Sequence, residues 1–127
     1  MTDAEKKHIA TTFIAGLRAR DAGMLDAIMA KDVIWSIPGS CLVSGAAHGV
    51  KGIVERAGHF AAYSLNIEIL YVLFGYTGMA LSLHNTGTHN GKTLDEHLTT
   101  VIQLEGDRIK RLDTYISDVE MLNAYFV

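Results

Sequence analysis

Asn85, Glu96 and Thr100 are the residues whose types and spacing fit acid–base chemistry on a small molecule. Each lies in a run of alternating apolar and polar residues, in phase with leucines that would face a core. A carboxyl removed from water has a raised pKa and can act as a general acid or base. Amide and hydroxyl groups can donate hydrogen bonds to a developing oxyanion. The alternative is that Glu96 sits at a solvated rim and that the threonines hydrogen-bond to one another.

The opposite phase of the same runs carries a second polar set, which consists of Ser82, His84, His97, Thr99, Asp113 and Tyr115. A histidine beside a carboxylate is the usual general base, and two histidines with an aspartate could hold a metal ion. A threonine-rich face that bears histidines is explained more simply as a subunit interface. We therefore predict an interface here and no metal site.

The elements that must position these side chains are three alternating runs joined by two glycine-bearing turns. Asn90-Gly91 between two runs of period two is the strongest short-range hairpin signal, and Gly106 marks the second turn. An apolar run before them, rich in β-branched and aromatic residues, is also typical of a strand. The predicted strands are Leu65–Tyr76, Ala80–Thr88, Thr93–Leu104 and Arg108–Ser117.

The first half of the chain supplies helices to cover this sheet. Apolar residues at helical spacing predict helices over Ala4–Arg20, Ala22–Ala30 and Val50–Tyr63. A short strand around Val33–Trp35 must turn at Pro38, which cannot donate to a strand ladder. Residues Cys41–Gly49 are predicted to form a loop, and Glu120–Phe126 a short helix or tail.

This order of elements predicts an α+β domain that comprises residues 1–127: a cone-shaped, curved antiparallel sheet wrapped around three N-terminal helices. The interior of such a cone is apolar and suits a small molecule. A net charge of −3 gives no electrostatic footprint for nucleic acid or an anionic membrane. The single cysteine and the lack of a signal peptide or an apolar span predict a cytoplasmic protein.

Several phrases resemble the SnoaL-like branch of the nuclear-transport-factor-2-like (NTF2-like) superfamily, which also holds ketosteroid isomerase. They are Asp32–Gly39, Ser44–Gly49, His84–Thr88 with Gly91–Asp95, Gly106–Ile109 and Tyr115–Asp118. The resemblance implies a cystatin-like α+β barrel and a homodimer formed through the sheet face described above. It spans nearly the whole chain.

The catalytic residues of ketosteroid isomerase do not carry over to this chain. Its proton-shuttling aspartate before the strand-ending proline is replaced by Ile37, and its tyrosine donor on the first helix by Phe13. Its protonated aspartic acid falls on or near Thr100. Isoleucine and phenylalanine neither move protons nor donate hydrogen bonds. The arginine of limonene epoxide hydrolase has no counterpart on Ala80–Thr88.

We therefore predict a cofactor-independent enzyme of isomerase, cyclase, dehydratase or hydrolase type that acts on an oxygenated hydrophobic compound. The expected catalytic residues are Asn85, Glu96 and Thr100. Two alternatives stay open: a non-catalytic protein that binds a hydrophobic ligand, and a dimeric interaction module. The expected ligand-binding residues are Phe13, Leu17, Trp35, His59, Tyr63, Leu83, Leu98, Leu112 and Thr114.

Overall fold

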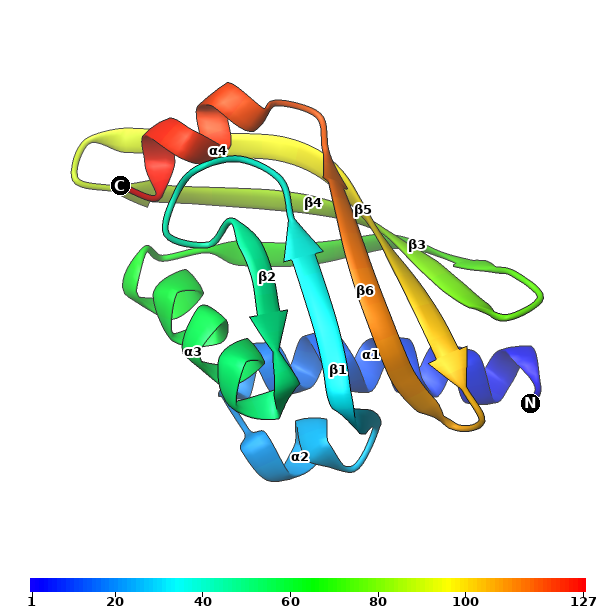
Figure 1. The fold of residues 1–127 in the computed structure, drawn as a ribbon. Coiled ribbons are helices and arrows are strands. Elements are labelled where there is room, and N and C mark those ends of the chain that lie inside the picture. Colours follow the sequence, from blue (N-terminus) through cyan, green and yellow to red (C-terminus); the bar gives the residue numbers. More distant parts are fainter.

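A six-stranded, curved sheet is the frame of the protein, whose computed structural model describes residues 1–127. The spatial order of the strands is β2-β1-β6-β5-β4-β3 (Figure 1). All neighbours are antiparallel except β1 and β6, which run parallel. The strands are β1 (Met29–Ile37), β2 (Gly45–His48), β3 (Asn66–Phe74), β4 (Gly78–His89), β5 (Lys92–Glu105) and β6 (Arg108–Ile116).

The predicted meander of β4, β5 and β6 is confirmed, and its first turn sets the register. Asn90 and Gly91 both have positive φ, 50° and 75°, as the tight turn between twisted strands requires. From this turn the pairing of β4 and β5 runs without a shift to Gly78 opposite Gln103. The register fixes which side chains of both strands face the interior.

Helices lie against the concave side of the sheet and at both of its ends, with α2 at the bottom and α4 at the top of Figure 1. The longest begins with a capping box between Thr2 and Glu5 and buries the predicted stripe that includes Phe13 and Leu17. None of the helices is long and apolar enough to cross a membrane. The helices are α1 (Asp3–Ala19), α2 (Ala22–Asp26), α3 (Gly49–Ala62) and α4 (Val119–Tyr125).

Two segments differ from the sequence prediction. The second helix ends at Asp26 instead of Ala30. The Ile109 amide donates a hydrogen bond of 2.7 Å to the Ile28 carbonyl, and the residues from Met29 onward form β1 beside β6. The predicted loop Cys41–Gly49 contains β2, which pairs with β1. The sequence Gly-Ala-Ala-His lacks the β-branched alternation that marks a strand.

Candidate functional site

A small apolar cavity lies inside the cone, between the concave face of the sheet and helices α1 and α3. Residues from β1, β3, β4, β5 and β6 form its wall, and Leu122 and Phe126 close it from the side of α4 and the chain end. Its volume is about 30 Å³, and about 10–15 Å³ suffices for one water molecule. The interior therefore has room for about two water-sized groups in this conformation.

Glu96 and Asn85 form the polar end of this cavity. They are directly opposite each other on β5 and β4, and only 2% of Glu96 and 8% of Asn85 are exposed. Both carboxyl oxygens of Glu96 and Oδ1 of Asn85 have no hydrogen-bond partner in the protein. Burial, with a smaller effect of the Asp118 carboxylate, raises the pKa of Glu96 to about 7. A buried carboxyl with this pKa can both give and take a proton near neutrality.

Thr100 lies at a different place in the same cavity and belongs to a second polar group. Its hydroxyl is 2.9 Å from the hydroxyl of Thr114, which accepts a hydrogen bond of 2.8 Å from Trp35 Nε1. Thr100 lies four positions after Glu96 along β5, a distance of about 13 Å at the usual rise per residue. The structure therefore brings Asn85 to Glu96 and pairs Thr100 with Thr114 instead.

Six of the nine predicted ligand-binding residues line the cavity: Phe13, Leu17, Trp35, Leu83, Leu98 and Thr114. The other three do not. Leu112 is fully buried on β6, opposite Ile102, and packs into the core away from the cavity. Tyr63 packs against Tyr125 and Phe126, and its hydroxyl donates to the Val127 carbonyl.

His59 is exposed on α3 and lies in an outer groove, outside the cavity wall. The inward face of the helix is taken by Ile53 and Ala57, which are fully buried, and by Phe60, which lines the cavity. One residue's rotation of about 100° separates His59 from Phe60 on a helix. The histidine therefore points away from the interior that Phe60 reaches.

Phe126 and Arg56 shape the cavity and were not among the residues predicted to line it. Phe126 is 1% exposed and meets the Phe60 ring edge-on at 6.1 Å. The spacing of four between Leu122 and Phe126 is the signal that could have indicated an inward helical face. The Arg56 guanidinium donates to the Trp35 carbonyl at 2.7 Å and lies 5.0 Å from the Trp35 ring, which fixes that wall. Burial lowers the pKa of Arg56 to about 10.

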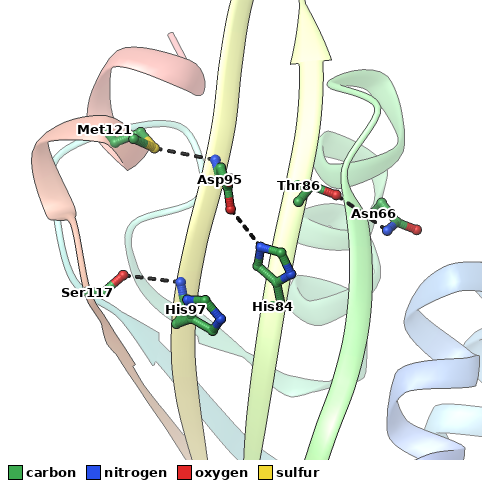
Figure 2. A network of polar contacts seen from close by, with 7 residues as sticks. All are labelled: Asn66, His84, Thr86, Asp95, His97, Ser117 and Met121. Atoms are coloured by element: carbon green, nitrogen blue, oxygen red, sulfur yellow. Dashed lines mark hydrogen bonds and ion pairs between the residues drawn. The ribbon is translucent and has the colours of Figure 1, made fainter.

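The predicted second polar set lies on the outer face of the sheet, and Figure 2 shows two of its members, His84 and His97, on the neighbouring strands β4 and β5. The His84 and His97 rings stack with centroids 4.6 Å apart, and His84 Nε2 is 2.6 Å from Asp95 Oδ1. Asp113 does not join them, since it accepts a hydrogen bond from Arg111 Nε at 3.0 Å. No three His, Cys, Asp or Glu side chains come together as metal ligands.

Comparison with known proteins places the fold. No family model matches the chain. Uncharacterised proteins of Mycobacterium tuberculosis and Mycobacterium bovis are 28% identical to it over 128 residues, which cover 98% of this chain and 97% of each relative.

Solved structures agree over nearly the whole chain. An NTF2-like protein from Burkholderia xenovorans has a TM-score of 0.82 at 21% identity and covers 100% of this chain and 99% of its own. The chain has the NTF2-like fold. A protein with a cystatin-like fold from Xanthomonas campestris gives 0.82 at 22% identity, with 95% and 97% of the two chains covered. A putative polyketide cyclase from Bacillus cereus gives 0.76 at 18%, with 96% and 80% covered. The predicted NTF2-like resemblance and fold class are thus confirmed.

Proposed function

We propose that this protein is a cofactor-independent enzyme that transfers protons on a small, oxygenated hydrophobic molecule held in the cavity. Isomerase, cyclase, dehydratase and hydrolase reactions all fall in this class. The observation that carries the proposal is the buried, unpartnered Glu96 carboxyl in an otherwise apolar interior. The putative polyketide cyclase among the neighbours of this fold supports the same class.

Glu96 is the proton carrier in this proposal. Its raised pKa of about 7 keeps both the acid and the carboxylate populated near neutrality, where general acid–base catalysis is most effective. The carboxylate takes a proton from a carbon or hydroxyl of the substrate and, as the acid, returns it to another atom. The Asn85 amide nitrogen, beside it on β4, donates to the oxygen that becomes negative.

A substrate needs more room than the present cavity has. Pockets for small molecules usually measure about 300–1,000 Å³, against about 30 Å³ here. The wall formed by Leu122 and Phe126 belongs to a helix of seven residues and the residue that caps it, and neither is part of the sheet. We propose that substrates enter by displacing it.

The test uses proton exchange, because it requires no knowledge of the reaction. Small ketones and enones are incubated with the protein in D2O, and deuterium uptake next to the carbonyl is followed by NMR. We expect uptake above background with the wild type and its loss in Glu96→Gln. Glu68→Gln, which removes an exposed glutamate on β3, is the matched control. Uptake that persists in Glu96→Gln would remove Glu96 from the mechanism, and a ligand bound without exchange would indicate a binding protein.

A second candidate function, a dimeric interaction module, is favoured by the outer face of the sheet. Tyr71, Ser82, Thr99 and Tyr115 lie side by side across four strands, and the two tyrosines are 67% and 66% exposed. The next row carries Leu73 and Val101, also exposed. Exposed tyrosine and aliphatic side chains that gather on one face in this way mark interaction sites.

We propose that this face pairs with a second copy of the chain through Ser82, His84, His97, Thr99, Asp113 and Tyr115. Sedimentation should give a dimer for the wild type and a monomer for Tyr115→Glu, whose buried charge would lack a partner. A wild-type monomer at micromolar concentration would contradict the pairing.

We also propose a cytoplasmic location, on the basis of the single cysteine.

A further inference from the structure

We propose that the polar end of the cavity binds the ammonium group of a small primary amine, with Glu96 as its counter-ion and Asn85 as an additional acceptor. This inference names the substrate or ligand class of the site above and rests on that proposed function. The interior holds more buried hydrogen-bond acceptors at this site than the protein has donors for.

Three buried acceptor oxygens at this end of the cavity have no donor in the protein. They are Oε1 and Oε2 of Glu96 and Oδ1 of Asn85, on directly opposite residues of β5 and β4. Buried acceptors of this kind are normally hydrogen-bonded, so the ligand that completes the site must bring donors. An alcohol supplies one O–H hydrogen, whereas a primary ammonium supplies three N–H hydrogens, which equals the number of free oxygens.

The charges around this end of the cavity favour a cation. No Lys, Arg or His forms an ion pair with Glu96. The carboxylate of Asp118, which caps α4, raises the pKa of Glu96 further through its negative charge. Lys92 is engaged with the Ala124 carbonyl at 3.0 Å, and Arg56 is held behind Trp35 by two backbone carbonyls. An ionised Glu96 is therefore the one charged side chain in the lining of the cavity, and it lacks a counter-ion.

The apolar walls of the cavity suit the hydrocarbon part of a small amine. The rings of Phe13, Trp35, Phe60 and Phe126 line the cavity and meet edge-on, with successive centroids 5.4, 5.9 and 6.1 Å apart. Aromatic rings attract alkylammonium ions and also accept their apolar parts. The cavity is small, about 30 Å³, so methylammonium, which has only two non-hydrogen atoms, is the probe of choice.

The experiment follows the Glu96 side-chain carboxyl carbon by NMR as a function of pH. One titration contains about 100 mM methylammonium chloride, because a ligand of two non-hydrogen atoms binds in the millimolar range at best. Matched titrations contain sodium chloride or methanol. We expect methylammonium alone to lower the pKa of Glu96. Binding should be about tenfold tighter near pH 8 than near pH 6, the ratio of ionised carboxylate for a pKa of about 7.

Two variants and one comparison decide the outcome. Glu96→Gln should abolish the pH dependence of methylammonium binding, and Glu68→Gln should retain it. The proposal is overturned if methanol binds as tightly as methylammonium, or if methylammonium leaves the Glu96 titration unchanged. The wild-type titration decides this even if Glu96→Gln does not fold. Deuterium exchange into ketones without methylammonium binding would contradict the amine site and leave the proposed enzymatic function supported. Methylammonium binding without deuterium exchange would contradict the enzymatic function and leave the amine site supported.

Discussion

The substitution Glu96→Gln should make the protein more stable at pH 8 and change its stability little near pH 4.5. Glutamine keeps the shape of the side chain and removes the charge. The folded carboxyl keeps its proton up to about pH 7, whereas in the unfolded chain it loses the proton near its ordinary pKa of 4.5. Between these values the folded state binds more protons, so the free energy of unfolding falls as the pH rises through this window.

The magnitude follows from the same two pKa values. One pKa unit corresponds to about 1.4 kcal/mol, so a pKa raised from 4.5 to about 7 costs the folded state about 3 kcal/mol once Glu96 is ionised. The side chain is 2% exposed, so solvent screening reduces this figure little. In a chain of 127 residues the gain at pH 8 corresponds to a melting temperature about 10 °C higher.

Urea denaturation of the wild type and Glu96→Gln near pH 5 and near pH 8 measures this difference. Comparing the two proteins at each pH cancels the titration of the other acids and histidines. A stability difference of the same size at both pH values would refute the reasoning, because it would mean that Glu96 titrates alike in the folded and unfolded chain. Glu68→Gln, on the outer face of β3, should show no such pH-dependent gain.

Four further substitutions test the packing of the cavity wall, the sheet and helix α3. Thr114→Val leaves Trp35 Nε1 without its acceptor and should cost about 1–3 kcal/mol in urea denaturation; an equal cost for Thr100→Val would contradict this, since Thr100 does not bond the indole. Phe126→Ala should cost about 3–5 kcal/mol and enlarge the cavity, so that an apolar fluorescent probe binds more tightly; unchanged probe binding would argue against entry beside α4. Gly78→Ala places a Cβ 1.9 Å from the Ile102 carbonyl oxygen and should lower the melting temperature sharply. Gly58→Ala, which meets no atom within 4 Å on α3, should raise it by the equivalent of about 1 kcal/mol.

The four long strands could be predicted because local signals specify them. Asn90 and Gly91 fix a tight turn, and the alternation on either side then assigns each residue of β4 and β5 to one face. The parallel pairing of β1 with β6 could not be predicted, because it joins strands far apart in the chain. For the same reason β2, four residues without a strong pattern, becomes a strand only through its pairing with β1.

The sequence predicted which face of the sheet carries the candidate site residues, but not which residues contact one another. Period-two alternation places Asn85, Glu96 and Thr100 on the inner face, and all three are buried there. Alternation does not give distance along the strand, so it did not separate Thr100 from Glu96 or pair it with Thr114. Alternation also does not show which side chains from the helices and the chain end fill the cone. Tyr63 and Leu112 were therefore expected to line the cavity, whereas Phe60 and Phe126 line it instead.

The energetic position of Glu96 links the fold to the proposed function. A carboxyl opposite Asn85 that accepts no hydrogen bond destabilises the folded state when ionised, and a leucine or methionine at this place would fill the interior at no such cost. No ion pair or hydrogen bond offsets the cost, and the Asp118 carboxylate adds to it. Residues that break a local rule of packing without compensation in the fold are expected at functional sites. A ligand that donates to Glu96 supplies the missing compensation, and the folded protein should then be stabilised by that ligand more strongly above pH 7 than below it.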